Sequence, residues 1–228
     1  MRESRSFCHD RRAQTVIPSG QTQIGRMLRW PLKAMPKAAV IPIMSGPARG
    51  VRWVVGASIH GCWLGTYEKT KQKRFAAAVS RNDVVYDLGA QAGFYSLLAS
   101  RLVGPQGAVY AFEPLPRNVG FLQEHIKLNG VTNINVFKLA IGGTDGTAQF
   151  EDGPNPLQGS LSERGAREVR IARLDTLFSE GQLRAPSVLK NRHRGWWIAS
   201  VYWSDEIARD PQAVGFPGDR CPVGLRVL

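Results

Sequence analysis

The chain of 228 residues predicts an α/β protein built around a mostly parallel sheet. Two observations carry this prediction. From residue 83 to residue 142, short apolar runs alternate with amphipathic helical stretches, and such βαβαβ alternation implies parallel strands joined by right-handed crossovers. The hydrophobic share of 43% indicates a globular core rather than a disordered chain. The length suits one domain with extensions.

The elements before the alternating region are a lead-in and a helix. Residues 51–68, VRWVVGASIHGCWLGTYE, are apolar and predict strand-like structure with Trp53, Trp63 and Tyr67 as anchors. Residues 68–79, EKTKQKRFAAAV, predict a helix that leads into the core.

The alternating region predicts three strands and two helices. The strands are expected at residues 83–89, 107–114 and 134–142, and the helices at 93–103 and 115–130. In the second helix, apolar residues recur at helical spacing and Gly130 provides a C-terminal cap. The sequence shows no internal repeat.

The chain divides into three regions by composition. Residues 1–50 predict a basic, proline-containing N-terminal arm, because prolines interrupt any long helix and no acid occurs between Asp10 and Glu68. A transit peptide has a similar composition, but the prolines favour a plain arm. Residues 51–190 form the expected core, and residues 191–228 form a tail that we expect to be irregular.

The net charge of +12 allows an anionic partner such as nucleic acid, or simply a solvated basic surface. The charge is spread out without a dense Lys/Arg block, so we do not expect nucleic acid as a partner. No apolar run is long enough to span a bilayer. The three cysteines are scattered and no CxxC or HExxH motif occurs, so we expect no metal, a reducing compartment and a cytoplasmic location.

A candidate cofactor site follows the first predicted strand in YDLGAQAGFYS, residues 86–96. Asp87 ends the strand, and Gly89 and Gly93 bracket the turn, where a residue without a Cβ lets the backbone approach a ligand. The helix that follows adds free N–H groups and a partial positive potential. Glu113 lies 20 residues after Gly93, at the end of the second strand, where an acid binds ribose hydroxyls in doubly wound folds.

The residues of the turn also indicate which cofactor to expect. The dinucleotide fingerprint G-x-G-x-x-G is absent, and an acid at the turn suits a cofactor with a cationic amino-acid end. S-adenosylmethionine has an ammonium, a sulfonium and a ribose. We expect Asp87 to serve the ammonium, Gly89 the backbone approach and Glu113 the ribose diol. The alternative is that Asp87 and Glu113 are ordinary strand-end acids of another α/β protein.

The sequence resembles the FkbM-type methyltransferases over roughly residues 40–190. The resemblance rests on residues 84–118, on LNGVTNINVFKLAIGGTDG, on GSLS and on RLDTLF. It implies a Rossmann-like class I methyltransferase fold and a SAM-dependent enzyme that methylates a hydroxyl of a sugar, glycan or small metabolite.

The resemblance also implies further site residues. Ala90 within the turn joins the cofactor site, and the adenine lies near Ala140 and Ile141. Glu68 and Ser160 are implied near the site.

No catalytic base is predicted. His60 and His125 favour structural roles, and Asp175 is expected to cap a short helix.

The resemblance stops at VLKNRHRGWW, residues 188–197. Members of that family continue after VLK with an acidic run, Ile-Asp-Val-Glu-Gly, that lies over cofactor and acceptor. Codons for Asn191–Trp197 exist from which removal of one base restores a nearly identical acidic run. We therefore hypothesise a one-base insertion, and keep a truncated or frameshifted pseudoenzyme with at most weak SAM binding as the alternative. Loss of the following strands predicts an uncovered sheet edge and an aggregation-prone chain.

Overall fold

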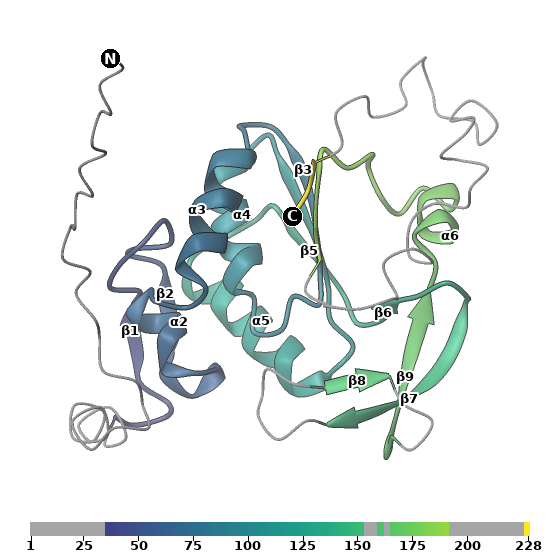
Figure 1. Cartoon of the computed structure of the whole chain (residues 1–228), viewed down its shortest axis with the longest axis horizontal. Helices are drawn as coiled ribbons and strands as arrows, with labels where there is room; N and C mark the ends of the chain where they lie inside the picture. Colours follow the sequence, from purple (N-terminus) through teal and green to yellow (C-terminus); the bar gives the residue numbers. More distant parts are fainter. Residues whose placement is uncertain (1–34, 153–158, 162–164, 192–225) are drawn as a thin grey trace, which may run out of the picture. The chain divides into compact units, whose positions relative to one another are not determined.

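The structure is a computed structural model that describes residues 35–152, 159–161, 165–191 and 226–228. The described residues from 36 onward belong to one compact unit. Its centre is a five-stranded sheet in the order β11-β10-β3-β4-β5, in which all neighbours run parallel (Figure 1). The strands are β3 Val84–Leu88, β4 Ala108–Phe112, β5 Ile134–Phe137, β10 Val188–Asn191 and β11 Arg226–Val227. The predicted α/β class with a mostly parallel sheet is confirmed.

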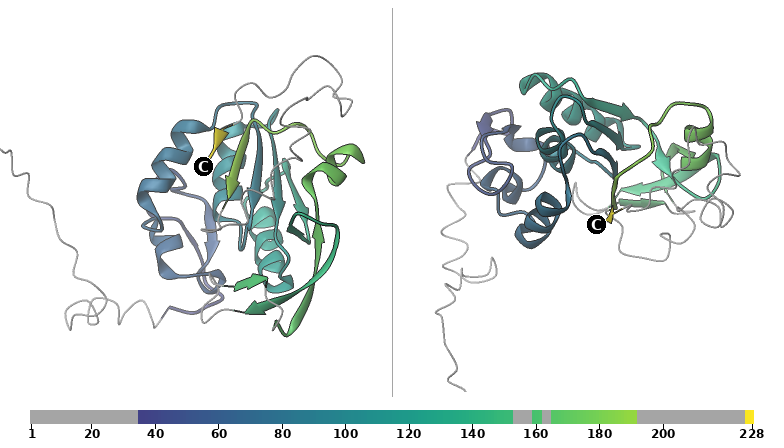
Figure 2. Two further views of the ribbon diagram at one scale, coloured as in Figure 1. Left: turned by 45° about the vertical axis from the view of Figure 1, so that its right-hand side comes forward. Right: turned by 90° about the horizontal axis from the view of Figure 1, so that it is seen from above.

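The two faces of this sheet have different partners because side chains alternate along each strand. Tyr86 and Leu88 of β3 and Phe112 of β4 join a buried cluster with residues from the segment between β5 and β10, including Leu174 and Leu177. Figure 2 shows the helices on the other side of the sheet. They are α3 Lys69–Ala78, α4 Phe94–Val103 and α5 Pro116–Leu128.

Helix α5 packs on the sheet through a second, smaller cluster. Leu122 of α5 is fully buried against Ala111 of β4 and Ala90 of the turn after β3. The helical spacing of its apolar residues, predicted from sequence, is thus used for packing against β4 and β5. Gly130 follows the helix with φ of 61°, the left-handed conformation expected of a helix-ending glycine.

The predicted strand over residues 134–142 is wrong in one respect, because it is divided between two sheets. The chain leaves the parallel sheet after Phe137, buries Leu139 in the core, and continues as β6 Ala140–Ile141. Strand β6 belongs to a four-stranded sheet in the order β6-β9-β7-β8. Its other strands are β7 Gly146–Asp152, β8 Gly159–Leu161 and β9 Arg167–Ala172.

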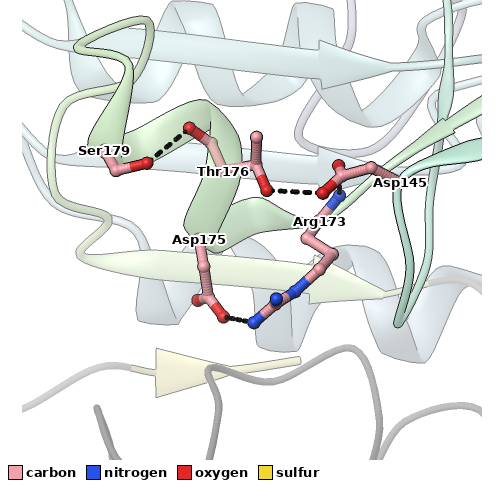
Figure 3. Close-up of polar contacts among 5 residues, drawn as sticks. All are labelled: Asp145, Arg173, Asp175, Thr176 and Ser179. Carbon is pink, nitrogen blue, oxygen red and sulfur yellow. Dashed lines mark hydrogen bonds and ion pairs between the residues drawn. The ribbon is translucent and has the colours of Figure 1, made fainter.

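Helix α6, Leu174–Ser179, is capped from another part of the chain (Figure 3). Asp145, from the turn between β6 and β7, accepts hydrogen bonds from Arg173 N–H at 2.9 Å and from the Thr176 hydroxyl at 2.7 Å. The prediction that Asp175 is the N-cap is wrong. Arg173 occupies that position, and Asp175, inside the helix, forms an ion pair with the Arg173 guanidinium at 2.7 Å.

The lead-in, residues 51–68, contains less strand and more helix than predicted. Within residues 51–68 only Arg52–Val54 forms a strand, β2, which pairs antiparallel with β1, Val40–Pro42. It is followed by the 3₁₀ turn η1, Val55–Ala57, and by the helix α2, His60–Leu64. Helix α2 ends at Gly65, where a Cβ would lie 1.9 Å from the carbonyl oxygen of Ser45. The predicted arm boundary at residue 50 falls between two strands that pair with each other.

Two of the three aromatic anchors predicted for the lead-in, Trp53 and Trp63, are buried, whereas Tyr67 is only partly buried. Trp53 is 0% and Trp63 4% exposed. His60 Nδ1 accepts a hydrogen bond from the Trp63 indole N–H at 3.2 Å, which gives His60 the structural role expected from the sequence.

The C-terminal residues meet the sheet at β10, where the sequence predicted an open edge. Strand β11 pairs with β10, and Leu228 N–H donates to the Leu189 carbonyl at 2.9 Å. Arg226 also forms an ion pair with Asp83 at 2.6 Å. The segment RHRGWW and the side chain of Ser160, both singled out in the sequence, lie outside the described residues. Within the described ranges, no helix has the length and apolar character needed to cross a membrane.

Candidate functional site

The turn after β3 adopts a conformation that few residues accept. Gly89, Gln91 and Gly93 have φ of 72°, 52° and 90°. Glycine takes such angles without cost, whereas Gln91 is a non-glycine residue in the left-handed region, which is strained and typical of functional turns. The amides of Gly89 and Ala90 both donate to the Phe112 carbonyl at 3.0 Å, which ties the turn to the end of β4.

Glu113 fixes the same turn from the end of β4. Its side chain accepts hydrogen bonds from the Gln91 N–H at 2.8 Å, the Leu115 N–H at 3.1 Å and the Asn118 amide at 3.0 Å. It is only 3% exposed. The carboxylate therefore joins the turn to the start of α5, at the carboxyl edge of the sheet where the sequence placed it.

Asp87 lies deeper than the sequence suggested. It is fully buried, accepts a hydrogen bond from the Ser96 hydroxyl at 2.6 Å, and forms an ion pair with Lys190 at 2.7 Å. Lys190 stands opposite Asp87 in the register of β10 and β3, and its ammonium also lies 5.0 Å from the centre of the Tyr95 ring. Both oxygens of Asp87 are thus engaged by protein groups.

A pocket of about 290 Å³, including its open mouth, lies beside the turn. Its lining comes from β2, the α2 region, the turn after β3, the start of α4 and the end of β10. The lining residues are Trp53, Ser58, Cys62, Tyr67, Gly89, Ala90, Gln91, Ala92, Phe94, Tyr95 and Lys190.

The six predicted cofactor residues divide into four groups. Gly89 and Ala90 line the pocket, while Asp87 and Glu113 lie behind its wall. Gly93 caps α4, and a Cβ there would lie 2.3 Å from Leu122 Cδ1. Packing against Leu122 alone therefore requires glycine at this position. Ala140 lies in β6 and is not among the lining residues.

Glu68 reaches the site through Tyr95. It precedes α3 with φ of 45°, accepts a hydrogen bond from the Tyr95 hydroxyl at 3.3 Å, and pairs with Lys71 at 2.7 Å. Partial burial raises the pKa of Glu68, but its bonds to Lys71 and Tyr95 outweigh this and hold the pKa below its usual value. Burial, together with the Glu68 charge, raises the pKa of Tyr95 far above its ordinary value, so Tyr95 is a neutral donor.

Sequence reasoning missed Lys190, Trp53 and Ser58 as pocket residues. Lys190 could be recognised only from the register that sets β10 beside β3, and Trp53 only from the fold of the lead-in over the turn. Among the described residues no group of three or more His, Cys, Asp or Glu side chains could hold a metal ion.

Residues 58–141 match the family model described as the TRM5/TYW2 methyltransferase domain. The protein-L-isoaspartate O-methyltransferase of Ignicoccus hospitalis is 34% identical over 61 residues, which cover 27% of this chain and 29% of that protein. This chain thus spans less than a third of the length of that relative.

Solved structures of methyltransferases are also similar to this chain. FkbM from Methylobacillus flagellatus KT is 18% identical and covers 54% of this chain and 28% of its own, with a TM-score of 0.38. TYW2 from P. horikoshii, solved with MeSAdo, is 20% identical and covers 46% of this chain and 37% of its own, with a TM-score of 0.35.

The matched domain contains the glycine turn and Glu113. The matched family model and the Ignicoccus hospitalis relative are methyltransferases, which is the enzyme class expected from the sequence. The match is to the TRM5/TYW2 model, so the narrower assignment to the FkbM type is not confirmed.

Proposed function

We propose that the chain is a SAM-dependent methyltransferase whose cofactor lies against the turn formed by residues 89–93. The observation that carries the proposal is the bond between Gln91 N–H and Glu113, which holds a strained turn at the carboxyl ends of two adjacent parallel strands. In open α/β sheets, ligands bind outside the carboxyl ends of the strands.

The residues present fit S-adenosylmethionine. Gly89 and Ala90 allow close backbone approach, and the first turn of α4 offers N–H groups. Glu113 follows β4, where an acid binds ribose hydroxyls in doubly wound folds, and a contact with the ribose requires movement of the turn, because the carboxylate is 3% exposed and bonded to Gln91 N–H. The proposed adenine position near Ala140 rests on the FkbM resemblance. When bound, the cofactor supplies an electrophilic methyl group, and the protein has to align the acceptor with it. Phe94 and Tyr95 line the pocket with aromatic rings.

The hydroxyl of a sugar or other small metabolite is the acceptor that the FkbM resemblance favours. An RNA acceptor is the second candidate, and the net charge of +12 favours it because phosphate groups attract a basic protein. Transfer of a tritiated methyl group to total RNA or to a panel of hydroxylated small molecules distinguishes the two. RNase-sensitive label whose yield falls steeply with salt establishes RNA, whereas label confined to small molecules establishes a metabolite.

A catalytically silent chain is the other possibility that the sequence raised, because the acidic run expected after Lys190 is absent. Calorimetric titration with S-adenosylmethionine, on this chain and on one with the reading frame restored at codon 191, tests it. Binding and methyl transfer by the chain as it stands support the enzyme. Binding by the restored chain alone establishes the damaged form, and binding by neither overturns the cofactor assignment.

The cytoplasmic location predicted from cysteine usage remains a proposal. Within the described residues, Cys62 is a buried thiol that lines the pocket.

A further inference from the structure

Two polar atoms on the pocket wall have no hydrogen-bond partner within the described part of the chain. They are the indole Nε1 of Trp53 and the hydroxyl oxygen of Ser58, and both atoms are buried. Trp53 itself is fully buried. Buried polar groups in folded proteins are almost always satisfied, so unsatisfied groups on two residues that line a pocket point to a partner that binds there.

A charged group of this pocket is the ammonium of Lys190. An ammonium has three N–H donors and no acceptor, and an indole N–H can only donate. One donor of Lys190 is directed to Asp87 Oδ1, 2.7 Å away. The Lys190 ammonium and the Trp53 indole can therefore only donate to a ligand, and the Ser58 hydroxyl can add a third donor.

The charge of the pocket points the same way. No aspartate or glutamate is among the lining residues that the structure describes, because Asp87 lies behind Lys190. The first turn of α4 adds further positive potential at its N-terminus. A carboxylate can accept hydrogen bonds from these donors, whereas an ammonium finds no acidic side chain among the lining residues that the structure describes.

We propose that Lys190, Trp53 and Ser58 form a carboxylate-binding subsite that receives the carboxylate of the cofactor's amino-acid end. This inference rests on the proposed function. Asp87 is then a positioning residue, which holds the Lys190 ammonium in the pocket instead of binding the cofactor's ammonium directly. The expectation from the sequence, that Asp87 serves the ammonium, is thereby replaced by an assignment of opposite charge.

The test is calorimetric titration of the full chain with S-adenosylmethionine and with its decarboxylated analogue, which keeps the sulfonium, the ribose and the amine. We expect the wild-type chain to bind the analogue at least about tenfold more weakly, the size expected when a charge-assisted hydrogen bond is lost. Trp53→Phe keeps the ring and removes only the N–H. It should weaken the natural cofactor by roughly three- to tenfold and leave the analogue unchanged.

Lys190→Gln should weaken the natural cofactor about tenfold or more, again without effect on the analogue. Because this change leaves Asp87 buried without its counterion, the pair Asp87→Asn with Lys190→Gln is measured as well. Trp63→Phe is the matched control, since its indole N–H is directed to His60 and Trp63 is not a lining residue, and it should change neither titration.

Equal losses for both ligands in the Trp53 and Lys190 variants would overturn the subsite while leaving the proposed function intact. So would a wild-type chain that binds the analogue as tightly as the natural cofactor. If the wild-type chain binds neither ligand, the proposed function itself fails, and the subsite fails with it.

Discussion

His125 Nδ1 lies 2.7 Å from the carbonyl oxygen of Ala92, so this buried ring is hydrogen-bonded to the turn beside the pocket. On its other side, Nε2 accepts a hydrogen bond from the Val54 N–H at 3.0 Å, and the ring stacks on Trp53 with centroids 4.0 Å apart. These contacts require the neutral tautomer with its proton on Nδ1, which donates to Ala92. His125 therefore connects α5, the turn and β2 without taking part in proton transfer.

The stability of the chain should depend on the protonation of His125. Burial lowers the pKa of His125 to about 4, from about 6.5 in the unfolded chain. As the pH falls from about 6.5 to 4, the unfolded chain takes up a proton that the folded chain does not, so the free energy of unfolding falls by about 3 kcal/mol from this residue. Above pH 6.5 the contribution is fully present.

His125→Phe isolates this effect. The variant keeps a ring against Trp53 but leaves the Val54 N–H and the Ala92 carbonyl without partners, and should cost about 2–4 kcal/mol at pH 7. The difference in unfolding free energy between wild type and variant, from urea denaturation, should shrink as the pH falls from 6.5 to 4. A difference that stays constant over this range would show that His125 is not buried in its neutral form.

Gly93→Ala should destabilise the fold by about 2–4 kcal/mol, because φ of 90° disfavours a side chain and the Cβ would overlap Leu122, which is fully buried. Gly120→Ala in α5 is the matched control. A Cβ at Gly120 meets nothing within 4 Å, and alanine favours a helix, so this variant should gain up to about 1 kcal/mol. Thermal unfolding of both variants checks the pair, and a tolerated Gly93→Ala would contradict the packing of α4 on α5.

The sequence predicted local elements well where periodicity and glycine placement agree. The strands around Asp87 and Phe112, and the two helices that follow them, depend on contacts within short stretches of chain. The division of residues 134–142 between two sheets could not be predicted, because Leu139 leaves the strand to fill a core cluster built from distant residues.

The pocket shows the same limit of sequence reasoning. The position of Glu113 near the turn follows from strand order alone, whereas the pairing of Lys190 with Asp87 depends on a register between strands that lie 103 residues apart. Because of this pairing, Asp87, the acid that the sequence analysis singled out, is buried behind Lys190. The Lys190 ammonium faces the pocket in its place.

Asp145→Ala should remove the cap of α6 shown in Figure 3 and lower the free energy of unfolding by about 1 kcal/mol at neutral pH. The backbone bond from Arg173 and the bond from Thr176 hold the pKa of Asp145 below its usual 3.8. The stabilisation is thus fully present above about pH 4 and is lost as the pH falls through the lower folded pKa. Asp145→Asn should retain most of the stability at neutral pH. A deficit of Asp145→Ala that does not shrink as the pH falls below 3.8 would count against this account.

Removal of the last three residues, 226–228, should expose the edge of β10 without unfolding the sheet. The deletion removes the bond from Asn191 N–H to the Leu228 carbonyl at 3.0 Å and the ion pair of Arg226 with Asp83 at 2.6 Å. We expect the Asn191 amide to lose its protection from hydrogen exchange, while amides of β4, which lies between two other strands, keep theirs. The single change Arg226→Ala removes a partly exposed ion pair and a long hydrogen bond to Ser80, at 3.5 Å, and should cost less than about 1 kcal/mol. If Asn191 exchanges as fast in the intact chain as in the shortened one, β11 does not pair with β10 in solution.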